Sequence, residues 1–163
     1  MRTEMDKSAL MDAFRQHLLH RLAELDAEQR AARAGTRVDG SHRPANRGER
    51  AAVTSQSYLA LGLGQRAEAL RDHLALLARI GPEPRDEVTS GALVTLEDEH
   101  GDCMHVLLLP GGEGTVLHTP EGPVTILSPR APLVRDLIGE PVGGDAVVLR
   151  GGQEVCVEVI AIA

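Results

Sequence analysis

Aromatic residues are almost absent from this chain of 163 residues, which has no tryptophan and only Phe14 and Tyr58. Carbohydrate sites and base-stacking nucleic-acid surfaces need flat aromatic side chains, so the composition argues against both. Two cysteines, Cys103 and Cys156, are too few for a disulfide scaffold. The chain has no apolar run near the ~20 residues that cross a bilayer, and its polar start does not resemble a signal peptide. We therefore expect a cytoplasmic protein without membrane contact.

Charge is distributed unevenly behind the formal net charge of -7. Residues 1–80 carry 13 basic and 10 acidic side chains, whereas residues 81–163 carry 4 and 14. Halves that differ this much in charge suggest two domains with different partners. Gly81-Pro-Glu-Pro84 stops a helix and stiffens a short connection, so we predict domains at 1–80 and 81–163.

The first half has the pattern of two helices. Residues 6–34 contain neither proline nor glycine, and a glycine-containing, turn-forming stretch follows over 35–48. Apolar residues recur at helical spacing on both sides of that stretch, which predicts an antiparallel helical hairpin, or coiled coil, with one seam buried against the other. The seam positions are Met11, Phe14, Leu18, Leu22, Leu25 and Ala32 in the first helix, and Val53, Gln56, Ala60, Leu63, Ala67, Leu70, Leu74 and Leu77 in the second.

The second half changes to short runs rich in Val, Ile, Leu and Thr, separated by glycine and proline turns. Residues 131–138 interrupt this pattern. Pro132 suits the first turn of a short helix and Gly139 suits its C-terminal cap. The pattern predicts an α+β domain, a small antiparallel sheet with one short helix.

The stretch from Ser128 to Asp145, SPRAPLVRDLIGEPVGGD, resembles the C-terminal signature of the Gre family of bacterial transcription elongation factors. In that family a Ser-Pro-x-Ser-Pro-Leu stretch leads into Leu-Leu-Gly-Lys-x-Val-Gly-Asp. Ala131, Val134 and Glu140 depart from the signature. The order of a helical hairpin followed by a sheet domain also agrees over essentially the whole chain. The matching residues are Ser128, Pro129, Pro132, Leu133, Leu137, Gly139, Val142 and Gly143, with Ile138 a conservative change.

This resemblance implies a role at RNA polymerase. In the family, an FKBP-like C-terminal domain docks at the rim of the polymerase secondary channel and the hairpin reaches through the channel. Two acidic residues at the hairpin tip then help to hold a metal ion that activates water for transcript cleavage, with further ligands from the polymerase. The chain need not be an enzyme by itself. The implied polymerase-binding residues are Ser128, Pro129, Arg130, Pro132, Leu133, Arg135 and Gly139.

The expected hairpin tip departs from the family. Its only carboxylates are Asp39 and Glu49, ten positions apart, and a surplus of arginine surrounds them. A basic tip repels a metal ion and fits contacts with RNA phosphates, a nucleotide or acidic polymerase residues. We therefore predict no cofactor and no strong stimulation of cleavage, with cleavage through Asp39 and Glu49, or a solvated loop without a role, as alternatives. The arginines of residues 30–50 are Arg30, Arg33, Arg37, Arg43, Arg47 and Arg50.

Two further classes of function remain open. A helical-hairpin interaction module unrelated to polymerase would dimerise through its seam, whereas our main prediction is a monomer. A nucleotide-dependent enzyme would use Gly62 and Gly64, which match a G-x-G-x-x-A fingerprint. That fingerprint needs a strand before it and a helix after it. The predicted helix runs through both glycines, so a helical role is the stronger interpretation.

Overall fold

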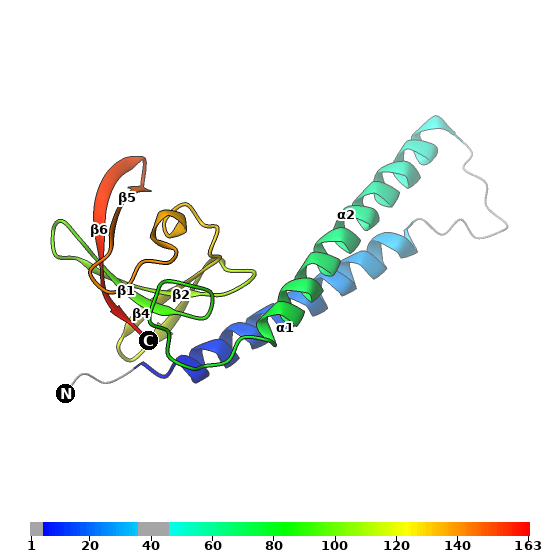
Figure 1. The fold of residues 1–163 in the computed structure, drawn as a ribbon. Coiled ribbons are helices and arrows are strands. Elements are labelled where there is room, and N and C mark those ends of the chain that lie inside the picture. Colours follow the sequence, from blue (N-terminus) through cyan, green and yellow to red (C-terminus); the bar gives the residue numbers. More distant parts are fainter. Residues whose placement is uncertain (1–4, 36–45) are drawn as a thin grey trace. The chain divides into compact units, whose positions relative to one another are not determined.

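The computed structural model describes residues 5–35 and 46–163, and Figure 1 shows their fold. The chain divides into two compact units. Gln16–His73 form one unit, and the chain up to Arg15 forms the other together with Leu74–Ala163. The domain boundary between residues 80 and 81 stays a prediction. Among the described residues, no helix is both long enough and apolar enough to cross a membrane.

The two predicted helices are present as α1, Lys7–Ala34, and α2, Arg47–Leu77. A short polar side chain precedes each one. The Asp6 carboxylate accepts a hydrogen bond from the Ala9 N–H at 3.0 Å, and the Asn46 amide oxygen accepts one from the Glu49 N–H at 2.9 Å. These bonds satisfy N–H groups that have no partner within the first turn of a helix, which explains where both helices begin.

Contacts within Gln16–His73 show that the two helices run antiparallel. Asp26 forms an ion pair with Arg71 at 2.7 Å, and the Gln29 side chain donates a hydrogen bond to the Ala60 carbonyl oxygen at 3.2 Å. The partner's residue number in α2 therefore falls as the residue number in α1 rises. The predicted hairpin is therefore confirmed. Leu70 and Leu74 are half-buried, whereas the seam prediction buries both, and Leu70 packs at the margin of the cluster. The centre of this core is Leu25, Ala32, Ala60, Leu63 and Ala67.

Six strands form one sheet in the order β3-β4-β2-β1-β6-β5. Four neighbouring pairs are antiparallel, as predicted, but β2 and β4 are parallel. The reason is the path of the chain: β3 runs back along the outer edge of the sheet, and β4 returns between β3 and β2. The strands are β1 Leu93–Asp98, β2 Cys103–Leu108, β3 Glu113–Thr119, β4 Gly122–Leu127, β5 Asp145–Arg150 and β6 Gln153–Ile162.

On one face of the sheet, Val88, Val134 and Leu137 pack on strand residues such as Val106 and Val148. Leu107 and Ile126 are buried on the other face. The expected short helix over 131–138 is smaller than predicted. Two turns closed by Ala131 and Val134 N–H groups lead into a single 3-10 turn, η1, Arg135–Leu137. Leu137 has no exposed surface. This one anchor holds η1 against the sheet, so a longer helix is not needed to cover the core.

Candidate functional site

The segment that carries the sequence signature connects β4 to β5 and is fastened at both ends by backbone hydrogen bonds. The Ser128 N–H donates to the Gly112 carbonyl oxygen at 2.8 Å. Farther along, the Gly139 N–H donates to the Val88 carbonyl oxygen, and the Val88 N–H donates to the Glu140 carbonyl oxygen, both at 2.8 Å. A connection whose one regular element is the short turn η1 is thereby held in one conformation, which a docking surface requires.

Local geometry explains two of the signature residues. Ser128 accepts a hydrogen bond on its Oγ from the Arg130 N–H at 3.3 Å, which tightens the first turn. Gly139 has φ +88°, a conformation that residues with a Cβ seldom adopt, and it ends η1. The predicted capping role of Gly139 therefore agrees with its backbone conformation.

In the signature segment, burial separates core residues from the predicted docking residues, which are either half-buried or exposed. Val134 and Leu137 are buried and fill the core, so their role is packing. Ser128, Pro129 and Leu133 are half-buried, and Leu133 packs against the same core. The exposed members, which alone are fully available to a partner, are Arg130, Pro132, Arg135 and Gly139.

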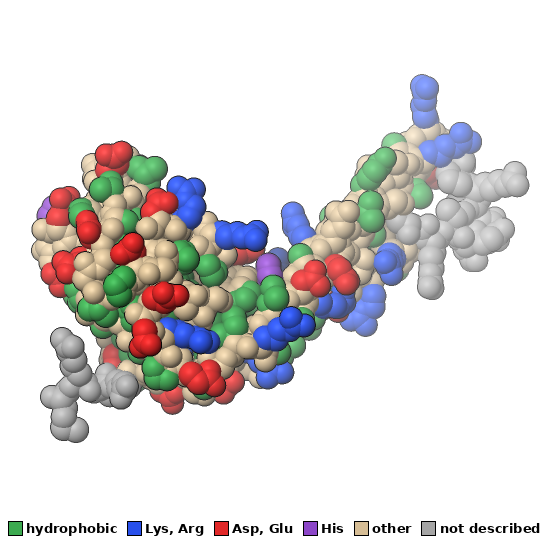
Figure 2. All heavy atoms as spheres, in the orientation of Figure 1, with side chains coloured by type: hydrophobic (Ala, Val, Ile, Leu, Met, Phe, Trp, Pro, Cys, Tyr) green, Lys and Arg blue, Asp and Glu red, His purple; other side chains and the backbone are tan. Residues whose placement is uncertain are grey.

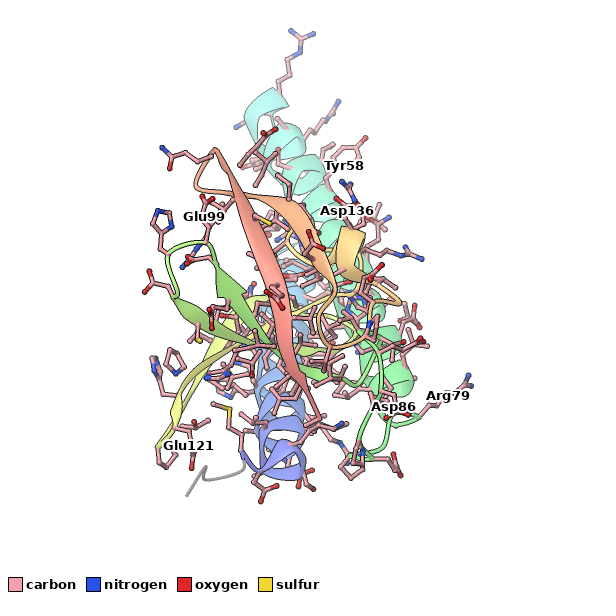
Figure 3. The ribbon with its side chains drawn as sticks, turned by 60° about the vertical axis from the view of Figure 1, so that its left-hand side comes forward. Tyr58, Arg79, Asp86, Glu99, Glu121 and Asp136 are labelled. Atoms are coloured by element: carbon pink, nitrogen blue, oxygen red, sulfur yellow. The ribbon has the colours of Figure 1, made fainter. Side chains whose placement is uncertain are left out.

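Two exposed apolar side chains lie in the same segment and were not among the predicted site residues. Ile138 is 42% exposed and Val142 is 56% exposed. Val142 matches the family signature and Ile138 is a conservative change, but a segment without helical or strand periodicity gives no sequence signal for which side chains face outward. Arg135 and Asp136 form an exposed ion pair at 3.3 Å beside them, and Asp136 marks η1 in Figure 3. The segment therefore presents apolar side chains bordered by charges of both signs, as interface patches do.

The hairpin tip lies partly outside the described residues, which include none of Arg37, Asp39 and Arg43. Arg47, Glu49 and Arg50 belong to the first turn of α2, and all three are exposed. The distance between Asp39 and Glu49 therefore lies outside what the structure describes. The described arginines at this end of the hairpin are Arg47 and Arg50 at the start of α2, and Arg30 and Arg33 near the end of α1.

Gly62 and Gly64 lie inside α2, with helix on both sides. A dinucleotide fingerprint needs its glycines in a turn between a strand and a helix, so that interpretation is wrong. Within the described ranges, no group of three or more His, Cys, Asp or Glu side chains is arranged to hold a metal ion. Desolvation and the neighbouring Glu97 carboxylate raise the pKa of the Cys103 thiol, so this cysteine is not an activated nucleophile.

The fold and its surface define a class: a helical hairpin combined with a small α+β sheet domain that presents a rigid surface segment. Similar solved structures include Gfh1, the GreA factor homologue 1 of Thermus thermophilus, at 19% identity and a TM-score of 0.40, covering 91% of this chain and 94% of that one. Gfh1 of Thermus aquaticus has 21% sequence identity and a TM-score of 0.40, and the match covers 90% of this chain and 92% of that one. A GreA/GreB elongation factor from Nitrosomonas europaea has 22% sequence identity and a TM-score of 0.33, and the match covers 58% of this chain and 78% of that one.

No protein-family model matches the sequence, and a comparison with curated proteins finds no match. The similar structures are those of Gre-type transcription factors, the family whose signature the segment from Ser128 to Asp145 resembles. At these identities the likeness concerns the fold.

Proposed function

We propose that this chain is a Gre-like transcription regulator that binds bacterial RNA polymerase at the secondary channel. The sheet domain docks through the signature segment, and the tip of the hairpin reaches inward. The observation that carries this proposal is the arrangement of the segment itself. Its two buried residues, Val134 and Leu137, anchor a fastened chain whose exposed residues include Arg130, Pro132 and Arg135.

A segment that only covered the core would not need so many exposed side chains. Ile138 and Val142 place apolar surface in water, which costs free energy unless a partner covers it. The signature thus combines packing residues, which keep its shape, with exposed residues, which a partner can bind. The segment that resembles the family signature is also the segment that exposes these side chains.

The proposed action of the hairpin differs from metal-assisted cleavage. Described arginines occupy the end of α1 and the start of α2, and further arginines belong to the connecting residues. Such a tip favours contact with RNA phosphates, nucleotide phosphates or carboxylates of the polymerase active centre. We therefore propose that the chain acts in the cytoplasm as a monomer, alters transcription without strong cleavage and is not itself an enzyme.

The alternative of a hairpin that dimerises through its seam loses support from the packing. Ala60, Leu63 and Ala67 are buried against Leu25 and Ala32 of the same chain. A second copy would reach these side chains only if the hairpin opened. Dimerisation of the folded chain through this seam is therefore not favoured.

The test is retention by core bacterial RNA polymerase. Arg130→Ala, Arg135→Ala and Glu140→Ala, made together, remove exposed side chains of the segment and should weaken retention without lowering the melting temperature. Arg79→Ala with Glu113→Ala is the control on exposed residues elsewhere in the same unit. Unchanged retention of the triple variant, or failure of the parent chain to bind polymerase, contradicts the proposal.

A further inference from the structure

The hairpin of β5 and β6 presents an exposed sheet face that no step of the proposed function uses. Gly151 and Gly152, with φ +60° and +84°, close a two-residue turn between the strands, and Val148 points into the core. Side chains alternate along a strand, so Val147 and Leu149 point to the opposite face. They are 59% and 64% exposed, among the most exposed large apolar side chains that the structure describes.

Carboxylates surround these two side chains in a regular pattern. Glu97 on β1 pairs with Glu158 on β6, and Glu158 pairs with Asp145 on β5, which places three carboxylates in one row across adjacent strands. Glu154 adds a fourth because it is the cross-strand partner of Leu149. Like charges directly opposite one another destabilise a sheet, so this row opposes folding until a cation approaches it. We call residues 97, 145, 147, 149, 154 and 158 the acidic–apolar face.

No lysine or arginine of these strands neutralises the row. β1, β2 and β6 contain neither residue, and β5 contains only Arg150. Arg150 points elsewhere, because its guanidinium lies 3.4 Å from the Asp98 carboxylate. Figure 2 shows the resulting concentration of acidic side chains over the part of the sheet domain that β5 and β6 form in Figure 1.

The chemistry of the face selects its occupant. β5 lies at the edge of the sheet, where its unpaired backbone N–H and C=O groups are available to another strand, and exposed apolar side chains favour such pairing. Two identical acidic faces repel each other, which disfavours a second copy of this chain, and a nucleic acid is repelled for the same reason. A segment with lysine or arginine beside an aliphatic side chain satisfies both the carboxylates and the apolar pair.

We propose that the acidic–apolar face binds a basic segment of a partner protein. Its cationic side chains pair with Glu154, Glu158 and Asp145, and an aliphatic side chain covers Val147 and Leu149. This surface shares only Asp145 with the signature segment, whose η1 packs on the opposite face of the sheet through Leu137. The inference does not rest on the proposed function, and its test requires no polymerase.

The test measures binding of a fluorescent peptide with alternating lysine and valine to the full chain by anisotropy, at low and high salt. Peptides with glutamate in place of lysine, or serine in place of valine, separate charge from apolar contact. Glu154→Gln with Glu158→Gln, and separately Val147→Ser with Leu149→Ser, should each weaken binding by about tenfold or more, equal to about 1.4 kcal/mol. Glu113→Gln with Val116→Ser, on exposed residues of the other edge strand, is the matched control and should not change binding.

Binding of the lysine–valine peptide that both face variants weaken and the β3 control leaves intact supports the inference. No binding, equal binding of the glutamate peptide, or equal loss in the β3 control overturns it. Sedimentation of the parent chain tests the remaining occupant, because a dimer abolished by Val147→Ser with Leu149→Ser would assign the face to a second copy. Circular dichroism melting confirms that each variant is folded.

Discussion

The side chain of Gln29 donates a hydrogen bond across the hairpin to the carbonyl oxygen of Ala60, at 3.2 Å. Gln29 stands at a seam position of α1, between Leu25 and Ala32, where the heptad pattern would place an apolar residue. The missing side chain of Gly64 provides the space, because a Cβ at that position would collide with the Gln29 amide nitrogen. A helix-weakening glycine in one helix and a polar residue in the other are therefore parts of one contact.

This pairing predicts different effects for two glycines of the same helix. A Cβ at Gly62 meets nothing within 4 Å, so Gly62→Ala should stabilise the hairpin by up to about 1 kcal/mol through helix propensity. Gly64→Ala gains the same propensity but displaces Gln29, whose hydrogen bond contributes about 1 kcal/mol. Circular dichroism melting should show a clear increase for the first variant and little net change for the second. Equal stabilisation by both would mean that the Gln29 contact contributes nothing.

The seam should be most sensitive at its buried centre. Leu63 is 7% exposed, and Leu63→Ala should lower the free energy of unfolding by about 2–5 kcal/mol if the cavity cannot collapse. Leu70 is half-buried, so Leu70→Ala removes less buried surface and should cost less than Leu63→Ala. Exposed Leu59, at 56%, is the matched control, and Leu59→Ala should leave the melting temperature nearly unchanged. A larger loss for Leu70→Ala would show that the seam centre lies elsewhere.

Acid should weaken the turn between β1 and β2 through Asp98. Hydrogen bonds from the Asp102 and His100 N–H groups, with Arg150 nearby, lower the pKa of this carboxyl in the folded state. A lowered pKa contributes stability that is complete above the unfolded value of about 3.9 and is lost as the pH falls through the folded value. Asp98→Asn should therefore melt lower than the parent at neutral pH and lose less on acidification. Asp86→Asn, at an exposed position, should follow the parent, and an equal acid response in both variants would contradict the prediction.

Much of the fold follows from periodicity, because helices and strands leave different repeats in a sequence. The helices were predicted from seams whose central members the structure buries, although Gln56 is exposed and Leu70 and Leu74 are half-buried. Gly139 was recognised because a positive φ favours glycine. Parallel pairing of β2 with β4 could not be predicted, since it depends on the order of strands in space. The Gln29–Gly64 contact was missed for a related reason: a polar seam residue and a helical glycine each look unfavourable until their proximity is known.

Apolar contact should contribute to docking of the signature segment. Ile138 and Val142 are exposed, so Ile138→Ser with Val142→Ser removes apolar area from a partner surface while leaving the buried anchor Leu137 in place. We expect weaker retention by core RNA polymerase and an unchanged melting temperature. Val116→Ser, at an exposed position on β3, is the control. Retention equal to that of the parent would restrict docking to the charged residues of the segment.

The hairpin tip provides the sharpest distinction between a regulator and a cleavage factor. Two like charges about 6 Å apart at an effective dielectric of about 20 repel by about 3 kcal/mol, so several arginines offset much of the attraction that Asp39 and Glu49 offer a divalent ion. The parent chain should therefore not strongly stimulate RNA cleavage in backtracked polymerase complexes. It should instead change initiation or elongation in a way that depends on its arginines.

Replacing Arg43, Arg47 and Arg50 together with alanine should abolish that effect and preserve retention by polymerase, because the signature segment is untouched. Arg15→Ala, Arg21→Ala and Arg66→Ala form the matched control, since they remove equal charge from exposed helical positions away from the tip. Cleavage is measured in a stalled complex with Asp39→Ala and Glu49→Ala alongside. Strong cleavage by the parent that either carboxylate variant loses would reverse the conclusion, because it would require the tip to hold a metal ion despite its arginines.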